Sequence, residues 1–203
     1  MYEPRLINQI DFQDKSTYND KIFVSLDIDW ASDEVLSYVL GILEQFKCPS
    51  TLFITHSTKV IDNISNNPLF EMGIHPNFNF LLEGDFRYGK NIDEIVDFYM
   101  DIVPKAKSAR SHSLTSSTPI LTALDKRGIK FDCNSFIPFQ GKSTHIEPFP
   151  IWINNLVRVP HFWEDNVNLL TFRQTYNLSE IISSEGLKIF DFHPIHIFLN
   201  SSS

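Results

Sequence analysis

Short runs of β-branched and aromatic residues recur along the chain, with more polar segments of helical periodicity between them. Most of these runs are nearly continuous apolar stretches rather than alternating ones, which is typical of strands covered on both faces of a parallel sheet. The seven strands predicted in this way span residues 21–29, 50–56, 70–78, 107–113, 128–136, 156–163 and 187–194.

Helices are predicted in the segments between these strands. The clearest covers residues 32–47, where Ser32 can cap the first turn, two acidic residues follow it and the apolar residues form one stripe. Residues 91–103 and 116–128 are also predicted to be helical, and residues 178–186 form a shorter candidate that stops at a glycine.

The alternation of strand and helix predicts a parallel α/β fold with right-handed connections. Seven strands in 203 residues suit a shortened or incomplete barrel better than a full eight-stranded one, and an open doubly wound sheet is the alternative. Residues 137–155, which include three prolines, are predicted to be a loop. Residues 1–203 are expected to form a single domain with an N-terminal extension at residues 1–20, because one core is sufficient at this length.

Composition excludes several classes of protein. The formal net charge of -8 and the scattered lysines and arginines leave no basic stripe for a phosphate backbone, so nucleic acid is not an expected partner. The chain contains no run of about 18 apolar residues and no apolar segment behind a basic N-terminus, so we expect no membrane span, no secretion signal and a cytoplasmic location. Cys48 and Cys133 lie far apart and are expected to be core residues.

The stretch from Lys21 to Trp30 runs from apolar residues directly into two aspartates, Asp27 and Asp29. Two carboxylates that point near one spot in a poorly solvated site repel each other unless a cation or a proton offsets them. A metal ion is therefore the first candidate for this end of the strand.

Histidines gather at the predicted carboxyl ends of the strands. Five of the seven follow this rule, on the same side as the two aspartates: His56, His75, His112, His161 and His193. The carboxyl ends of parallel strands meet at one face, where the sites of such folds are built. A single histidine is more often a satisfied loop or core imidazole, and His56 and His161 could be bystanders of this kind.

Taken in order, these segments resemble the polysaccharide deacetylase superfamily, also called the NodB homology domain. That family opens with a strand that ends in two aspartates, here SLDIDW, followed by a strand of the ATFFV type, here STLFITH. Its GxH motif, with a second ligand four residues on, falls at Gly73 to Asn79, its arginine falls in ARSHS and its last histidine in FDFHP. The resemblance spans about residues 21–200, and the ordered set carries it rather than any single motif.

The resemblance implies a distorted seven-stranded parallel (β/α) barrel. It also implies a metal-dependent hydrolase that removes an acetyl or other acyl group from an N-acetylated sugar or a related amide. Asp27 would be the general base, held by Arg110, and His193 would be the acid that protonates the leaving group. The expected partner is accordingly a small-molecule or glycan substrate.

The same resemblance implies a metal site that contains Asp29 and His75. Asn79 stands where the family has its second metal histidine, so either Asn79 or His112 would complete the ligand set. Zinc is the metal we expect first, with cobalt, manganese, nickel and iron as alternatives.

Other polar and aromatic residues near the strand ends have two interpretations each. Trp30 and Trp163 are candidates for stacking on sugar rings, although aromatic residues near a barrel mouth more often pack against the protein. Glu164 and Asp165 could line the site or solvate the start of a helix. Asp132 could support the site or cap a turn.

Two other functions fit parts of the sequence. A strand that ends in DxD also opens phosphatases of the haloacid dehalogenase type, but Gly and Thr normally follow the second aspartate there, whereas Trp30 and Ala31 follow it here. A catalytically silent carbohydrate-binding barrel is the other alternative, because Asn79 replaces the second metal histidine. Hydrolysis of an acetylated sugar that depends on added zinc or cobalt would distinguish the enzyme from both.

Overall fold

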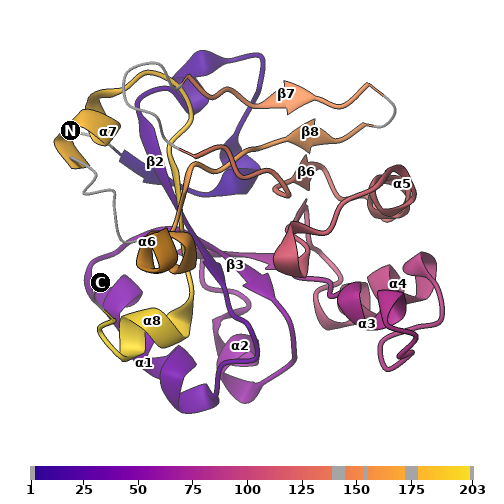
Figure 1. The fold of residues 1–203 in the computed structure, drawn as a ribbon. Helices are drawn as coiled ribbons and strands as arrows, with labels where there is room; N and C mark the ends of the chain where they lie inside the picture. Colours follow the sequence, from indigo (N-terminus) through magenta and orange to yellow (C-terminus); the bar gives the residue numbers. More distant parts are fainter. Residues whose placement is uncertain (1–2, 139–144, 153–154, 172–177, 202–203) are drawn as a thin grey trace.

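A single curled sheet runs through the computed structural model, which describes residues 3–138, 145–152, 155–171 and 178–201 (Figure 1). The ten strands are β1 (Glu3–Arg5), β2 (Lys21–Asp27), β3 (Ser50–Ile54), β4 (Phe70–Ile74), β5 (Ser108–Ala109), β6 (Phe131–Asp132), β7 (Phe149–Pro150), β8 (Val157–Arg158), β9 (Trp163–Glu164) and β10 (Ile189–Phe192). Their order is β7-β8-β6-β5-β4-β3-β2-β10-β9, with β1 paired to β2 beside this path. Every pairing among the described strands is parallel except that of β7 with β8.

The predicted parallel α/β fold is confirmed, but the predicted count of seven strands is not, since the sheet has ten. The run predicted at 156–163 divides into β8 and β9, which pair with opposite parts of the sheet. Strand β7 lies in the stretch 137–155 that was expected to be a loop. Strands β1 and β7 are only three and two residues long, too short for the hydrophobic period to reveal them.

The sheet is curled into a half-barrel. Arg110 directly follows β5, yet its Nη1 donates a hydrogen bond of 2.9 Å to Asp27 at the end of β2. In the sheet order β5 and β2 are three strand positions apart, which in a flat sheet is about 14 Å and further than an arginine side chain reaches. In addition, residues 159–162 connect β8, which pairs with β6, to β9, which pairs with β10. The curl favours the barrel over the open doubly wound sheet.

The described residues also form eight helices. They are α1 (Asp33–Gln45), α2 (Lys59–Ile64), α3 (Asn79–Leu82), α4 (Ile92–Ile102), α5 (Thr118–Lys126), α6 (Asp165–Thr171), α7 (Leu178–Ser183) and α8 (Pro194–Phe198), with short 3-10 turns at Ile7–Gln9, Lys15–Thr17 and His112–Leu114. Helix α1 begins after Ser32, whose Oγ accepts from the Val35 backbone N–H, as the sequence predicts. Helices α1 and α8 contact each other, as do α4 and α5 (Figure 1). Among the described residues, no helix combines the length and the apolar character needed to cross a membrane.

The predicted helices at 91–103, 116–128 and 178–186 correspond to α4, α5 and α7. Helices α2, α3, α6 and α8 were not predicted, because each has four to seven residues and shows no periodic stripe.

Two apolar clusters hold the fold together. The larger lies between the sheet and the helices α1, α2, α4 and α5, and the smaller includes Ile7, Tyr18 and Phe23. The N-terminal extension therefore packs as part of the domain, with β1 added to the sheet. Cys133 is buried and Cys48 is half-buried against the larger cluster, and both are free thiols.

Candidate metal and catalytic site

The chain turns sharply where β2 ends. Asp29 and Trp30 have φ angles of 37° and 56°, in the left-handed region that residues other than glycine seldom adopt. The turn is closed by a hydrogen bond from the Ala31 N–H to the Ile28 carbonyl, and Trp30 N–H donates to the Thr55 hydroxyl. This strained turn places the carboxylate of Asp29 among histidines from two other strands.

Asp29, His75 and His112 bring three potential ligand atoms together. Asp29 Oδ1 lies 3.2 Å from His75 Nε2 and 3.1 Å from His112 Nδ1. Two ligands of a tetrahedral zinc ion, each about 2.1 Å from the metal, are about 3.4 Å apart, so the donor set fits such an ion. Burial would raise the pKa of Asp29, but hydrogen bonds from His112 and His75 outweigh it and hold the pKa below its ordinary value.

Asn79 contacts the loop that carries His112. Its Nδ2 donates to Ser113 Oγ at 3.1 Å, and its Oδ1 accepts from Thr115 Oγ1 at 3.2 Å. The loop is strained as well, since Ser113 and Leu114 have φ angles of 56° and 53°. In the structure, His112 therefore lies beside Asp29 and His75. The Asn79 amide binds the loop that carries His112.

Arg110 forms the centre of a buried cluster. The residue is 0% exposed and its guanidinium carbon lies 4.4 Å from the centre of the Phe53 ring. Its Nη1 donates to both Asp27 Oδ1 and Asp191 Oδ1, and its Nη2 donates to Ser25 Oγ at 3.1 Å. Burial would raise the pKa of Asp27, but the charges of Arg110, His75 and His193 together outweigh it and hold the pKa below its ordinary value. Asp27 is thus kept ionised, as a general base requires.

Asp27, Asp191 and His193 form a second group of potential ligands, with one atom of each within 4.8 Å of the others. The Arg110 guanidinium, however, already contacts both carboxylates of this group. The positive charge between these carboxylates is therefore that of Arg110.

His193 is oriented by a carboxylate from another element. Its Nδ1 lies 2.7 Å from Asp165 Oδ1 and its backbone N–H donates to Asp165 Oδ2, while its Nε2 lies 3.5 Å from Asp29 Oδ2. Burial alone would lower the pKa of His193, but the hydrogen bond with Asp165 and the charges of Asp191 and Asp27 raise it to about 10. The imidazole is thus protonated at neutral pH and presents Nε2 on the side of Asp29.

Asp165 is the first residue of α6, but it is buried and therefore does not solvate the start of that helix. Its Oδ1 accepts from the Asn166 backbone N–H at the start of α6, and the same carboxylate holds His193. Asp132 caps a turn, since its Oδ1 accepts from the backbone N–H of Asn134, and its carboxylate also contacts side chains near the site. It accepts from Arg158 and Asn134, and Asn134 Oδ1 in turn accepts from the Ser111 N–H, between Arg110 and His112.

The two tryptophans proposed for sugar stacking lie in different surroundings. Trp30 is 38% exposed and its ring meets the His112 ring edge-on at 5.2 Å, so it lies beside the histidine cluster. Trp163 packs against Phe192 and Phe190 at ring distances of 4.9 and 6.0 Å.

The remaining histidines have local partners. His56 Nδ1 lies 2.9 Å from the Thr55 hydroxyl, and His161 Nε2 lies 3.4 Å from Glu164 Oε2.

The sequence analysis did not single out Ser25, Asp191 and Asn134. Ser25 and Asp191 each lie two residues before a predicted catalytic residue: Asp27 ends the strand of Ser25, and His193 directly follows the strand of Asp191. Residues two apart on a strand face the same side, so a polar residue at that position within an apolar run was a usable signal.

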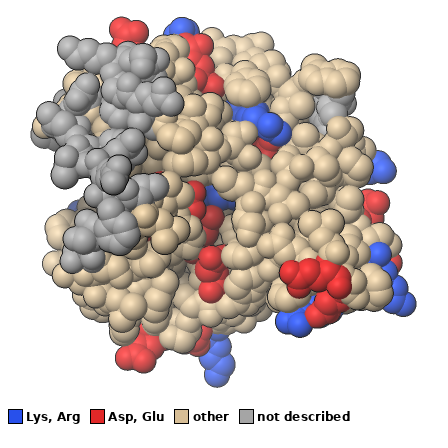
Figure 2. All heavy atoms as spheres, viewed as in Figure 1, with Lys and Arg blue, Asp and Glu red and all other residues tan. Residues whose placement is uncertain are grey.

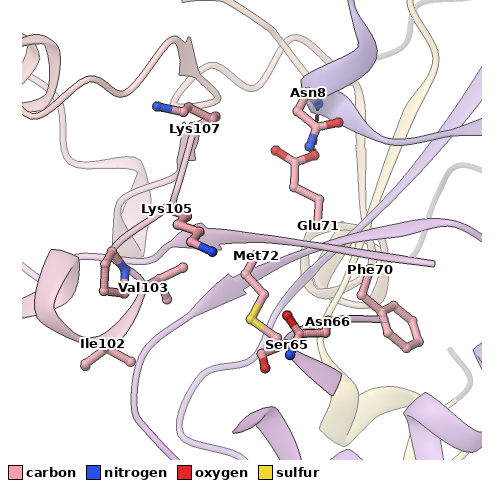
Figure 3. Close-up of a pocket in the computed structure, with 11 residues that line it drawn as sticks. Asn8, Ser65, Asn66, Phe70, Glu71, Met72, Ile102, Val103, Lys105 and Lys107 are labelled. Atoms are coloured by element: carbon pink, nitrogen blue, oxygen red, sulfur yellow. Dashed lines mark hydrogen bonds between the residues drawn. The ribbon is translucent and has the colours of Figure 1, made fainter. Parts of the chain in front are cut away.

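A cavity of about 370 Å³ lies elsewhere, at the amino end of β4 (Figure 3). Phe70, Glu71 and Met72 line it, whereas His75 follows the carboxyl end of the same strand. Figure 3 shows Asn8 and Glu71 close together, and the Asn8 backbone N–H donates to Glu71 Oε2 at 2.9 Å. In parallel barrels, residues at the amino ends of the strands usually contribute to stability rather than to catalysis.

The face seen in Figure 2 has acidic atoms near its middle, and its basic atoms are scattered without forming one patch.

Comparison with known proteins identifies the family of the chain. The family model described as WbmS-like polysaccharide deacetylase matches residues 24–203. The chain is 37% identical to a proposed polysaccharide deacetylase involved in O-antigen biosynthesis, WbmS from Bordetella bronchiseptica, with a TM-score of 0.89 over 100% of this chain and 82% of that one. No curated protein matches the chain.

More distant structures share the fold alone. A proposed polysaccharide deacetylase from Mycobacterium smegmatis is 15% identical, with a TM-score of 0.55 over 96% of this chain and 82% of that one. The 4-alpha-glucanotransferase from Thermococcus litoralis is 14% identical, with a TM-score of 0.53 over 86% of this chain and 33% of that one.

Proposed function

The chain belongs to the WbmS-like polysaccharide deacetylase family, and from this premise we propose that it is a metal-dependent hydrolase that removes an acetyl or other acyl group from an N-acetylated sugar. The observation that supports this most is the convergence of Asp29, His75 and His112 on one point. A base held by Arg110 and an acid held by Asp165 flank that point on two sides. The comparisons give the phosphatase alternative no support.

Asp29, His75 and His112 would hold the divalent ion, with zinc as the first candidate. One carboxylate and two imidazoles suit zinc, and three protein ligands leave a position open, as catalytic zinc sites do. When bound, such an ion polarises a carbonyl group and lowers the pKa of water. Asn79, through Ser113 and Thr115, would hold the loop of His112 in place rather than act as a ligand.

Two side chains would then move the protons. Asp27 takes a proton from the water that attacks the acyl carbon, and Arg110 keeps its carboxylate ionised beforehand. As the C–N bond breaks, His193 donates its Nε2 proton to the departing amine, and Asp165 stabilises the charged imidazole until that step. The products are the free amine of the sugar and acetate or another carboxylate.

The substrate class follows from the family and from the relative of known structure. That relative is described as involved in O-antigen biosynthesis, and we propose that this chain also acts on a glycan or a sugar precursor of a surface polysaccharide. Trp30, half-exposed beside His112, is the candidate for packing on the sugar ring. The cytoplasmic location stays a prediction, and a nucleotide- or lipid-linked sugar would be consistent with it.

The test is release of acetate from N-acetylated sugars by the purified protein. The protein is stripped with EDTA, reloaded with zinc or cobalt, and assayed on chito-oligosaccharides and on a nucleotide-linked N-acetylhexosamine. We expect acetate release that depends on added metal. Sugar binding without acetate release under every metal would instead support the silent binding barrel, and phosphate release from p-nitrophenyl phosphate would support a phosphatase.

A further inference from the structure

Asp191 is a buried carboxyl group that the proposed chemistry does not use. It lies in β10 at 0% exposure, and β10 pairs with β2 so that Asp191 stands opposite Ser25. Its Oδ1 accepts a hydrogen bond of 2.6 Å from Ser25 Oγ and a second one from Arg110 Nη1. Its Oδ2 is buried and has no hydrogen-bond partner among the described residues. A buried polar atom without a hydrogen-bond partner costs free energy, so a carboxyl group at this position calls for an explanation.

The contacts of Arg110 suggest an explanation. A guanidinium bound only to Asp27 could turn about its side-chain bonds and would leave the orientation of that carboxylate open. Here Nη1 contacts Asp191 as well as Asp27, and Nη2 donates to Ser25, which itself donates to Asp191. The Arg110 fork is therefore fixed at both terminal nitrogens.

We propose that Asp191 is a positioning residue for the hydrolysis: together with Ser25 it fixes the Arg110 guanidinium, and Arg110 in turn fixes the carboxylate of Asp27. The inference rests on the proposed function, since it assigns Asp191 a part in orienting the base of that reaction. A base must lie within hydrogen-bond reach of the proton that it takes, and a misplacement of about 1 Å can cost about 100-fold in rate.

The hydrogen bonds that Asp191 accepts determine which substitution of this residue should be tolerated. Two carboxyl groups face one guanidinium, and burial raises the pKa of Asp191 well above its ordinary value. Asp191 acts on Arg110 and Ser25 through its accepting oxygen Oδ1. An asparagine at this position keeps the accepting oxygen, whereas a leucine keeps the approximate size and loses it.

The chain offers a matched control in the same sheet. Glu71 is also a buried carboxyl group, and it accepts a hydrogen bond of 2.8 Å from the hydroxyl of Ser108 in β5, two residues before Arg110. It lines the cavity at the amino end of β4 (Figure 3), whereas His75 follows the carboxyl end of that strand. Replacing Glu71 by leucine therefore reports what the loss of a buried carboxyl group does to the fold alone.

The kinetic experiment compares Asp191→Leu, Asp191→Asn and Glu71→Leu in zinc-loaded protein. For Asp191→Leu we expect kcat to fall about 10- to 100-fold, with KM and metal content unchanged. For Asp191→Asn we expect kcat within about threefold of the parent protein, because the acceptor oxygen remains. Glu71→Leu should lower the melting temperature without changing kcat. A parent-like kcat in Asp191→Leu, or an equal loss in Asp191→Asn, overturns the proposal.

A second measurement reads the positioning without turnover. In nitrogen-15 NMR spectra, a fixed guanidinium gives separate Nη1 and Nη2 signals, and a rotating one gives averaged signals. We expect separate Arg110 signals in the parent protein and in Asp191→Asn, and averaged signals in Asp191→Leu. Averaged signals in the parent, or separate ones in Asp191→Leu, overturn the proposal even if no N-acetylated substrate is hydrolysed.

If Asp191→Leu does not fold, Ser25→Ala replaces it. That variant removes only the hydroxyl that Arg110 and Asp191 share, and we expect a smaller fall in kcat at unchanged KM, with partly averaged Arg110 signals. Unchanged kcat together with separate signals in Ser25→Ala contradicts the proposal.

Discussion

Two buried carboxyl groups, Asp191 and Glu71, stand in one row across the sheet and have different surroundings. The register pairs Asp191 with Ser25, Ser25 with Thr51, and Thr51 with Glu71. Asp191 meets the guanidinium of Arg110, next to the catalytic cluster. Glu71 meets neutral donors, namely the Thr51 and Ser108 hydroxyls and the Asn8 N–H.

The difference shows that a buried carboxyl group can support either the stability of the fold or the chemistry of the site. Beside the catalytic cluster, Asp27 and Asp191 share the guanidinium of Arg110, which helps to hold the base in its ionised form. At Glu71, the carboxyl group is surrounded by neutral donors that fasten the N-terminal extension to β3 and β4. Both carboxyl groups accept hydrogen bonds, so the chemical nature of the partner decides the role of each group.

The largest effect should come from the metal site. We expect Asp29→Ala to lose the metal and at least about 10³-fold in activity, because it removes the ligand that both His75 and His112 face. Mass-spectrometric metal analysis and the acetate assay check this. Asp27→Asn should lose rate but keep the metal, so it is the matched variant.

The melting temperature of Asp29→Ala also tests whether the catalytic cluster contributes to the stability of the fold, as Glu71 is expected to do. The melting temperature of this variant should stay near that of the parent, because Asp29 is a partly exposed residue outside the apolar clusters. Metal retained in Asp29→Ala would defeat the ligand assignment, and a large loss of stability would show that the catalytic end also supports the fold.

The second effect concerns the acid. We expect Asp165→Asn to lower kcat about 100-fold, because it removes one of the carboxylates that together raise the pKa of His193 to about 10. The alkaline limb of the pH–rate profile should move to lower pH, since the imidazolium then loses its proton earlier. Acetate release from pH 6 to 10 measures both. An unchanged alkaline limb would exclude His193 as the acid that Asp165 supports.

Much of this arrangement could be predicted from the sequence, for a physical reason. Asp27, Asp29, His75, His112 and His193 occupy the ends of strands, and in a parallel sheet all such ends meet at one face. Their positions at the ends of predicted strands were therefore enough to place these residues together. In the structure they lie within a few ångströms of one another.

The partners inside the strands could not be placed in this way. Asp191 and Ser25 are far apart in sequence, and they meet because of a register between β10 and β2 that no local pattern encodes. The division of 156–163 into β8 and β9 likewise depends on the curl of the whole sheet, which follows from tertiary packing. Asp165 was ambiguous because its contact with His193 joins two distant loops.

The third effect concerns Glu71 and the free energy of unfolding. Glu71→Leu would leave the Asn8 N–H and the Thr51 and Ser108 hydroxyls without their shared acceptor. We expect a loss of about 1–3 kcal/mol in the free energy of unfolding, measured by urea denaturation. Metal content should not change. A variant as stable as the parent would mean that water replaces the carboxyl group at no cost.

The smallest effect is a pH dependence that belongs to Glu71 alone. Burial raises its pKa above the ordinary 4.5, outweighing the hydrogen bonds from Asn8, Thr51 and Ser108. Above pH 4.5 the folded state therefore keeps a proton that the unfolded chain has lost, so this group makes stability fall as the pH rises toward the folded pKa. One such proton changes the free energy of unfolding by at most about 1.4 kcal/mol per pH unit. Glu71→Gln cannot lose that proton, so its stability relative to the parent should increase with pH above 4.5. Urea unfolding of both proteins at several pH values measures the difference, and a difference that stays level or shrinks would mean that Glu71 is ionised in the folded protein, like Asp27 at the catalytic end.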